Sequence, residues 1–210
     1  MTPEAFAAAA GVSRETLARL VAYVDLLRKW QARINLVATA SLDDVWRRHV
    51  LDSAQLVALI QDADRVTDLG SGAGFPGLVV AIVRGGPVDL VESDARKCAF
   101  LREAARIAAA PVTVHNARAE AVVPWPADVV TARAVAPVAE LLALSYPFVR
   151  LAEPRPGCAL LLKGARADAE LTEAARKWHM TVTRSGSVSD PSGCILRIDD
   201  IAPLGDRRQG

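Results

Sequence analysis

The sequence is poor in cysteine and has almost no excess of charge of either sign. Among 210 residues there are three cysteines, Cys98, Cys158 and Cys194, and no two of them have Cys-x-x-Cys spacing. They therefore predict neither a disulfide framework nor a metal site, and they are typical of a protein in a reducing compartment. Lys and Arg (25) nearly balance Asp and Glu (24), so the net charge of +1 excludes a generally basic surface. Any binding of nucleic acid must then come from local basic clusters.

Long hydrophobic runs are also missing. No apolar run approaches the roughly 18–20 residues that cross a bilayer. The stretch MTPEAFAAAAGVSRE has no basic residue ahead of its short alanine run, so no signal peptide is predicted. We therefore expect a cytoplasmic protein that does not bind membranes. Hydrophobic residues make up 51% and charged residues 23% of the chain, a composition typical of a globular protein with its own core.

The N-terminal part carries helix patterns and no strand pattern. Apolar residues recur at three- and four-residue steps from Ser13 to Ile34, and Ser13 is the predicted N-cap. A second helix is predicted from Ser41 to Ile60, because Asp44 follows Ser41 with the spacing of a capping box. We predict that residues 1–62 form an N-terminal helical extension.

From Arg65 onward, strand and helix patterns alternate. The predicted strands are Val66–Leu69, Val88–Glu92, Val112–Val114, Asp128–Thr131 and Cys158–Leu162. The predicted helices are Pro76–Arg84, Asp94–Ala109, Pro137–Val149 and Ala165–Trp178. Several of these strands are continuously apolar, which favours a parallel sheet covered on both faces.

The C-terminal part breaks this alternation. The stretch TVTRSGSVSDPSGCILRID predicts two strands around a turn, since it leaves no room for a helix between them. The predicted fold is α/β, a Rossmann-like sheet over residues 63–205 that ends in an antiparallel hairpin. We expect residues 206–210 to form a flexible tail.

The stretch TDLGSGAGFPG, Thr67 to Gly77, holds four glycines directly after the first predicted strand. The flanking residues are apolar, so the stretch is not a polar linker. A glycine turn at the carboxyl end of such a strand is where open α/β folds bind ligands. Pro76 suits the first position of a helix, and the N-terminus of that helix offers N–H groups and partial positive charge to a ligand. GAGFPG matches G-x-G-x-x-G, but no Lys-Ser or Lys-Thr follows, which excludes a P-loop.

Two acidic residues at strand ends bear on the identity of this ligand. Asp68 stands two residues before Gly70, where a carboxylate could meet a cationic group such as the ammonium of S-adenosylmethionine. Glu92 ends the second strand, where it could accept hydrogen bonds from ribose hydroxyls, and an NAD site would place an acid there too. The antiparallel hairpin favours S-adenosylmethionine, because the dinucleotide-binding fold has a parallel sixth strand.

Seven stretches of the chain resemble one family, the bacterial 16S ribosomal RNA guanine-N7 methyltransferases, once called glucose-inhibited division protein B. The stretches are LLRKWQARINLV, RRHVLDS, DLGSGAGFPG, LVESDARKCAFL, ARAEAV, VVTARAVAP and LLLKG. The resemblance implies a class I S-adenosylmethionine-dependent methyltransferase that modifies N7 of a guanine in the small-subunit rRNA, guanine 527 in the family. It implies the small ribosomal subunit or its assembly intermediate as partner. We expect a monomer without a metal.

The resemblance also implies particular site residues. Its cofactor contacts fall on Gly70, Phe75, Ala119, Glu120 and Arg133. Arg133 closes the fourth strand, where cofactor and target base should meet, and is expected to orient them. Asp68, Gly72 and Glu92 are added to the cofactor set because they lie in the glycine loop or at strand ends.

Substrate contacts are expected at five basic residues, although a single basic group on a helix is more often a solvated surface than an RNA site. They are Arg48, His49, Lys97, Arg118 and Lys163. The resemblance favours Arg48 and His49, and the last three belong near the carboxyl edge of the sheet. Guanine N7 carries a lone pair and no hydrogen, so the reaction requires alignment and no general base.

The sequence also bears on three other functions: a hydrolase, a non-catalytic binding protein and an oxidoreductase. His49, Asp52 and Ser53 share one helical face, but no nucleophile elbow or oxyanion hole accompanies them, so a hydrolase is excluded. An Arg48–Asp52 surface pair is the plain alternative for that cluster. A non-catalytic RNA- or nucleotide-binding protein of the same fold and a small NAD(P)-dependent oxidoreductase stay open as alternatives.

Overall fold

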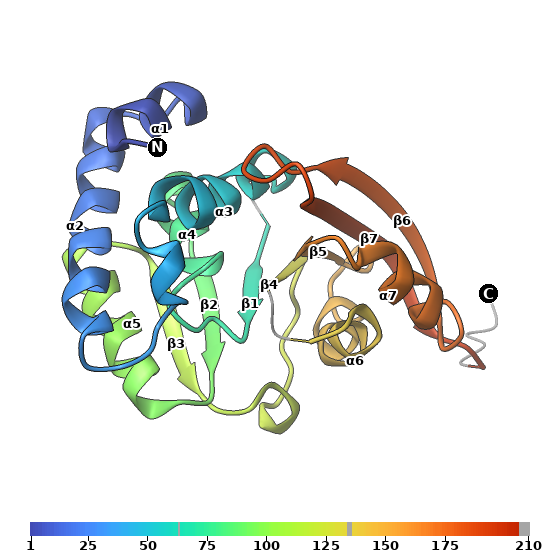
Figure 1. The fold of residues 1–210 in the computed structure, drawn as a ribbon. Helices are drawn as coiled ribbons and strands as arrows, with labels where there is room; N and C mark the ends of the chain where they lie inside the picture. Colours follow the sequence, from blue (N-terminus) through green and yellow to red (C-terminus); the bar gives the residue numbers. More distant parts are fainter. Residues whose placement is uncertain (63, 134–135, 206–210) are drawn as a thin grey trace.

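The computed structural model describes residues 1–62, 64–133 and 136–205, and a seven-stranded sheet forms the centre of this part (Figure 1). Its strands are β1 (Val66–Leu69), β2 (Val88–Glu92), β3 (Val112–Asn116), β4 (Val129–Arg133), β5 (Cys158–Lys163), β6 (Trp178–Gly186) and β7 (Cys194–Pro203). They lie in the order β3-β2-β1-β4-β5-β7-β6. Strands β1 to β5 pair in parallel, whereas β7 is antiparallel to both β5 and β6.

The strand predictions are confirmed, with ends that shift by one or two residues. β4 begins at Val129 and continues to Arg133, and β5 includes Lys163. The C-terminal hairpin is confirmed as well, since β6 and β7 pair along their length. The predicted flexible tail, residues 206–210, lies outside the described residues.

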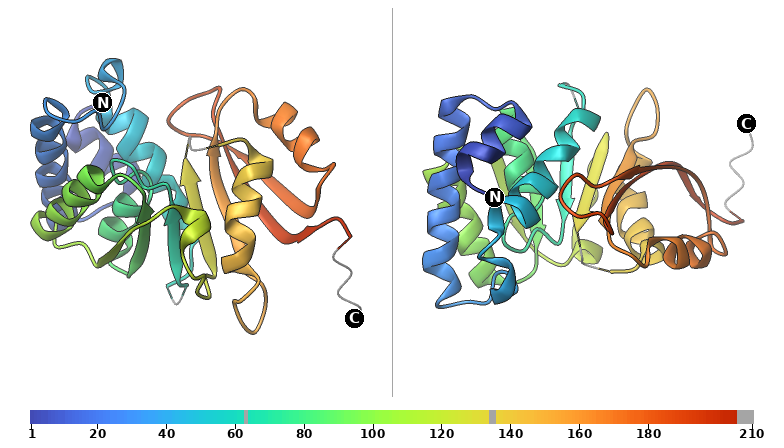
Figure 2. Two further views of the ribbon diagram at one scale, coloured as in Figure 1. Left: turned by 90° about the horizontal axis from the view of Figure 1, so that it is seen from below. Right: turned by 45° about the horizontal axis from the view of Figure 1, so that its top comes forward.

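Helices cover both faces of the sheet, as the apolar strands predicted. The helices that follow the glycine loop are α4 (Gly77–Arg84), α5 (Ala95–Ile107), α6 (Val138–Val149) and α7 (Ala167–Ala174). Helix α2 (Arg14–Gln31) packs on α4 and α5, while α6 packs on β4, β5 and α7 (Figure 2). The last helix ends at Ala174, before the predicted Trp178, because Trp178 begins β6 and packs edge-on against Tyr146 of α6.

The two faces of the strands divide the core into two clusters. Val129 and Leu160 belong to the cluster that includes α2, α4 and α5, whereas Val130 and Leu161 belong to the cluster around α6. This alternation follows from the two-residue period of a strand. Of the helices in the described residues, none combines the length and the apolarity that spanning a bilayer requires.

Capping explains the start of the N-terminal helices. Helix α1 (Pro3–Ala10), which was not predicted, begins after Thr2, whose hydroxyl accepts from Ala5 N at 3.2 Å, and ends at Gly11 in the left-handed conformation. Helix α2 follows Ser13, whose hydroxyl accepts from Thr16 N at 3.1 Å, so the predicted N-cap is confirmed.

The prediction of one continuous helix from Ser41 to Ile60 is wrong. This stretch contains the short 3-10 turns η1 (Thr39–Ser41) and η3 (Gln55–Leu59), a π-helical segment η2 (Trp46–Leu51) and one turn α3 (Asp52–Ala54). The Asp44 side chain does not cap a helix, because it accepts from Arg47 Nε at 2.7 Å and from the N-terminal ammonium at 3.2 Å. π-Helical turns are rare and often occur at functional sites.

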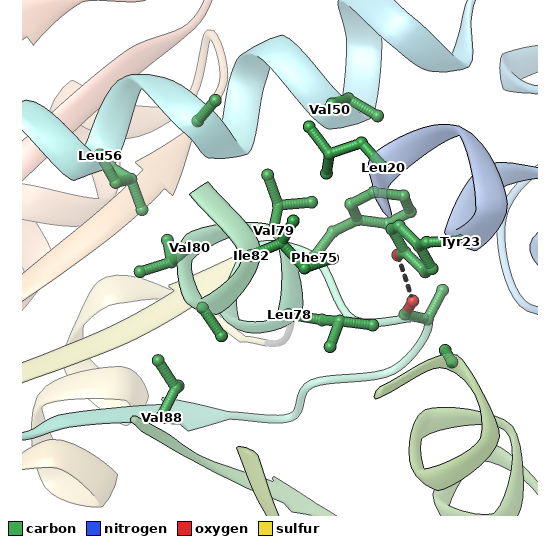
Figure 3. Packing of buried hydrophobic residues seen from close by; sticks show 14 of the residues in the cluster. Leu20, Tyr23, Val50, Leu56, Phe75, Leu78, Val79, Val80, Ile82 and Val88 are labelled. Carbon is green, nitrogen blue, oxygen red and sulfur yellow. Dashed lines mark hydrogen bonds between the residues drawn. The ribbon is translucent and has the colours of Figure 1, made fainter. Parts of the chain in front are cut away.

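The N-terminal helical segment shares its core with the sheet. Leu20 of α2, Val50 of η2 and Leu56 of η3 lie on the side of α4 that carries Val79, in the same hydrophobic cluster as Leu78 (Figure 3). All of these side chains are buried. The predicted boundary between residues 62 and 63 therefore does not separate two hydrophobic cores.

Candidate functional site

A cavity of about 540 Å³ opens at the carboxyl ends of the parallel strands. Its wall includes the glycine loop after β1, the ends of β2 and β4, and residues of the N-terminal segment. The cavity brings together most of the predicted site residues: Gly70, Gly72, Phe75, Glu92, Ala119, Glu120 and Arg133 of the cofactor set, and Arg48, His49, Lys97 and Arg118 of the substrate set. Open α/β folds bind their ligands at this edge.

Lys163, which is described in full, lies outside the cavity wall. Its ammonium pairs with the carboxylate of Glu170 in α7 at 2.6 Å and donates to the carbonyl of Ala136 at 3.0 Å. The Lys163 side chain is 8% exposed. This placement does not support the prediction that Lys163 contacts substrate, because Glu170 of α7 already pairs with its ammonium.

Asp68, also in the described part, is buried beneath the start of α4 and does not line the cavity. Its Oδ1 accepts from the Thr131 hydroxyl at 2.7 Å, and its Oδ2 has no hydrogen-bond partner among the described residues. Burial raises the pKa of Asp68 to about 6, although the Thr131 hydrogen bond opposes this shift. This placement does not support the prediction that Asp68 meets a ligand ammonium directly.

The raised pKa of Asp68 should make the free energy of unfolding depend on pH. Between its ordinary pKa of 3.8 and its folded value of about 6, the folded protein binds the proton more tightly than the unfolded chain. Ionisation of Asp68 therefore lowers the free energy of unfolding as pH rises through this window. We expect Asp68→Asn, which has no such proton, to gain on the order of 3 kcal/mol relative to the unmodified protein between pH 4 and pH 7.

Urea unfolding of both proteins at several pH values measures this difference. The lowered pKa of His49 gives a contribution to stability of the opposite sign over an overlapping pH range, but both proteins share it, so it cancels in the comparison. Parallel pH dependences of the two unfolding free energies would contradict the assignment.

The glycines of the loop serve the backbone conformation and close packing. Gly70, Gly72 and Gly74 have φ of +69°, +55° and +97°, in the left-handed region that favours glycine. At Gly77 the reason is different, since an added Cβ would lie 2.5 Å from Asp68 Cβ. Gly77 thus allows α4 to approach β1 closely.

Hydrogen bonds from two sides hold this loop. Gly70 N and Ser71 N both donate to the carbonyl of Val91, at 2.9 and 3.1 Å. On the other side, the Tyr23 hydroxyl of α2 donates to the carbonyl of Ala73 at 2.6 Å (Figure 3). Tyr23 is fully buried, and the sequence pattern did not single it out.

Glu92 connects the loop to the end of β2. Its Oε2 accepts from Gly72 N at 2.9 Å and its Oε1 accepts from Asp94 N at 2.7 Å. The residue is 7% exposed and lines the cavity. Each carboxylate oxygen has further lone pairs, so Glu92 can still accept hydrogen bonds from a diol in the cavity.

Arg133 is held at the cavity wall by several neighbours. Its Nη2 lies 2.8 Å from His49 Nδ1, and its Nη1 donates to the carbonyl of Arg48 at 3.2 Å and faces Asp52 Oδ2 at 3.5 Å. The guanidinium carbon lies 5.0 Å from the centroid of the Phe75 ring. The His49 ring stacks on the same Phe75 ring, with centroids 4.9 Å apart and planes at 23°.

Asp52 is a site residue that sequence reasoning missed. Its Oδ1 accepts from Gln55 Nε2 and from the Ser187 and Ser189 hydroxyls of the β6–β7 turn, at 3.0, 3.2 and 2.6 Å. Its Oδ2 faces Arg133, 81 positions away in the sequence. Asp52 therefore faces Arg133 and does not form the surface pair with Arg48 that was the alternative. The only sequence signal was its helical proximity to His49.

The exclusion of a hydrolase is supported by geometry. The Ser53 hydroxyl donates to the backbone carbonyl of His49 at 2.7 Å, and Ser53 is fully buried. It is therefore engaged away from the imidazole. Among the described residues, no group of three or more His, Cys, Asp or Glu side chains is placed to hold a metal ion.

Comparison with known proteins decides the family. Residues 16–192 match the family model described as GidB, rRNA small subunit methyltransferase G. The chain belongs to this family. It is 57% identical over 202 residues to the Ribosomal RNA small subunit methyltransferase G of Rhodospirillum rubrum, covering 96% of this chain and 98% of the relative. It is 54% identical over 203 residues to the protein of the same name from Paramagnetospirillum magneticum, covering 96% of this chain and 97% of the relative.

Solved structures show the methyltransferase fold. Magnesium protoporphyrin IX methyltransferase of Synechocystis PCC 6803, solved with bound SAM, aligns with a TM-score of 0.58 and 16% identity over 89% of this chain and 97% of that chain. TYW2 of M. jannaschii, in complex with AdoMet, aligns with a TM-score of 0.55 and 14% identity, over 80% of this chain and 77% of that chain. The predicted Rossmann-like methyltransferase sheet and the resemblance to the methyltransferase G family are thus confirmed.

Proposed function

We propose that this protein transfers a methyl group from S-adenosylmethionine to N7 of a guanine in 16S rRNA, guanine 527 by family resemblance. The observation that supports this most directly is the cavity at the carboxyl ends of the strands, whose wall combines the glycine loop, Glu92 and Arg133. In a member of the rRNA small subunit methyltransferase G family, these residues suit a nucleoside cofactor and an incoming base.

The cavity residues fit S-adenosylmethionine by their chemistry. The free lone pairs of Glu92 suit the ribose hydroxyls, and the 3-10 turn η4 (Ala119–Ala121), which follows β3, suits the adenine. The apolar ring of Phe75 and the donors of Arg133 also line the cavity, next to η2, and suit the methionine portion. When bound, S-adenosylmethionine supplies an electrophilic methyl group.

The protein needs to align the reactants and exclude water, and it has little acid–base chemistry to perform. Guanine N7 attacks through its own lone pair, so no proton must be removed for the bond to form. Good alignment alone contributes roughly 7–11 kcal/mol in favourable cases. Arg133, fixed by His49, Asp52 and the Arg48 carbonyl, supplies a rigid reference point for this alignment.

Three basic residues around the cavity are proposed to bind the RNA. Arg48 of η2, Lys97 of α5 and Arg118, just before η4, come from different elements and all line the cavity. We propose that they contact phosphates, while the target base is flipped out into the cavity. We further propose that the protein is a monomer and that it acts in the cytoplasm on the small subunit or its assembly intermediate.

Methyl transfer to undermethylated RNA tests the function. Labelled S-adenosylmethionine is incubated with the protein and with either naked 16S rRNA or small subunits from a strain that lacks this gene, and the product is mapped by mass spectrometry. One methyl group at N7 of the proposed guanine is the expected result, and RNA from the parent strain is the control. No transfer with intact RNA binding would favour a non-catalytic binder, and titration with NADH tests the oxidoreductase alternative.

A further inference from the structure

The two ring nitrogens of His49 have neighbours of opposite kinds. Arg133 Nη2, 2.8 Å from Nδ1, can only donate, so Nδ1 must accept. On the other side, Nε2 lies 2.7 Å from the Ser41 hydroxyl oxygen. This hydroxyl donates its one hydrogen to the carbonyl of Ala38, at 2.6 Å. The Ser41 oxygen therefore accepts from His49, and the imidazole carries its hydrogen on Nε2.

We propose that His49 is a positioning residue that orients the Arg133 guanidinium through a fixed, neutral imidazole, and that Ser41 sets its tautomer. The chain of hydrogen bonds runs from the Ala38 carbonyl through Ser41 and His49 to Arg133. This inference rests on the proposed function in so far as Arg133 acts in methyl transfer. It gives His49 a role other than the substrate contact expected from the sequence.

Packing keeps the imidazole in place between its two partners. The His49 ring and the Arg133 guanidinium both contact the Phe75 ring, at centroid distances of 4.9 and 5.0 Å. The π-helical segment η2 carries His49, and η1 carries Ser41, so the broken helix geometry of residues 39–51 brings the two side chains together. A regular helix from Ser41 would place residues eight positions apart more than two turns from each other.

The charges around His49 favour the neutral form. Burial is the largest cause that lowers its pKa, to about 3, and the positive charges of Arg133 and Arg48 act in the same direction. Asp44 opposes this shift, and Asp52 lies on the far side of Arg133, with its Oδ2 3.5 Å from Nη1. A protonated ring would also turn Nδ1 into a donor that faces the guanidinium. Nδ1 thus stays an acceptor between pH 5 and pH 8.

A double-mutant cycle tests whether His49 acts through Arg133. His49→Phe keeps a ring on Phe75 but removes both nitrogens, whereas His49→Asn keeps an acceptor close to the position of Nδ1. We expect His49→Phe to lower kcat/KM by about tenfold to a hundredfold, as for loss of a hydrogen bond to a charged group, and His49→Asn to recover most of this loss. In the Arg133→Ala background, His49→Phe should cause no further loss.

The matched control is His179→Phe, because His179 is an exposed histidine on β6 and not part of the cavity wall. The readout is total methyl transfer to small-subunit rRNA, whichever nucleotide receives the methyl group. A methyl group at another nucleotide would therefore overturn the proposed target guanine, but the double-mutant cycle would still test the role of His49. An equal loss from His49→Phe in both backgrounds would overturn the positioning role.

Nitrogen NMR of histidine-labelled protein gives a second test that requires no RNA. The signals of His49, assigned by their loss in His49→Phe, should show a protonated Nε2 and an unprotonated Nδ1, unchanged from pH 8 to pH 5. A titration near the ordinary histidine pKa of about 6.5, or a proton on Nδ1, would overturn the inference even if the variants lose activity.

Discussion

Arg133→Ala is expected to lower kcat/KM for methyl transfer by about 10²–10³-fold, the usual cost of removing one preorganised polar group from an active site. The guanidinium is oriented by the His49 ring, the Arg48 carbonyl, Asp52 and Phe75, so its donors face the cavity without reorganisation. Initial rates with small-subunit rRNA at varied S-adenosylmethionine concentrations measure the effect. The fold should survive, because Asp52 keeps its hydrogen bonds to Gln55, Ser187 and Ser189.

Arg133→Lys should recover little of this activity. A lysine ammonium is a compact charge and lacks the planar fork that reaches His49 Nδ1 and the Arg48 carbonyl while it stacks on Phe75. Arg150→Ala is a matched control, since Arg150 also lies over an aromatic ring, that of Tyr146 at 5.6 Å, but is not in the cavity wall. Full turnover by Arg133→Ala with a normal melting temperature would remove Arg133 from the site.

Glu92→Ala should weaken binding of S-adenosylhomocysteine by about a hundredfold, within the 2–5 kcal/mol typical of truncating a buried hydrogen-bonded charge. Two effects combine. The variant loses the carboxylate proposed to bind the ribose hydroxyls, and it leaves the N–H groups of Gly72 and Asp94 without their acceptor. The glycine loop then loses the contact that joins it to the end of β2.

Calorimetric titration with S-adenosylhomocysteine measures this loss. Glu92→Gln separates charge from shape, because it keeps one acceptor oxygen but turns an amide NH₂ toward the other N–H donor, and we expect it to bind weakly as well. Glu103→Ala is the control, since Glu103 pairs with Arg106 on the exposed side of α5. An unchanged dissociation constant for Glu92→Ala would contradict the proposed role of Glu92.

Much of the cavity was predictable because its residues lie at the ends of strands. Val66–Leu69 and Val88–Glu92 have strong apolar patterns, and the topology of a parallel sheet brings their carboxyl ends to one edge. Glu92, the last residue of β2, and Gly70, which follows β1, therefore meet in space although they are distant in the chain. Local pattern and one topological rule were sufficient for the glycine loop and Glu92, whereas Phe75, Ala119, Glu120 and Arg133 were implied by the family resemblance.

The structure gives no support to the predicted contacts where a side chain has a choice of partner. Lys163 lies at the predicted strand end, but its ammonium pairs with Glu170 of α7 and not with the cavity. Asp68 also lies where it was expected, but the close approach of α4 at Gly77 buries its carboxylate. Strand position determines where a residue sits, and packing between helix and sheet determines what its side chain reaches.

Periodicity, turn residues and motif spacing are local, so the strands, the glycine loop, the antiparallel hairpin and the resemblance to the methyltransferase G family could be predicted from the sequence alone. Three contacts became apparent only in the folded chain: His49 accepts from Arg133, Ser41 orients His49, and Asp52 faces the guanidinium. His49 and Arg133 are 84 positions apart, and Asp52 and Arg133 are 81 apart. Contacts at such separations depend on how the broken helix of residues 39–59 packs over the sheet, which no local pattern specifies.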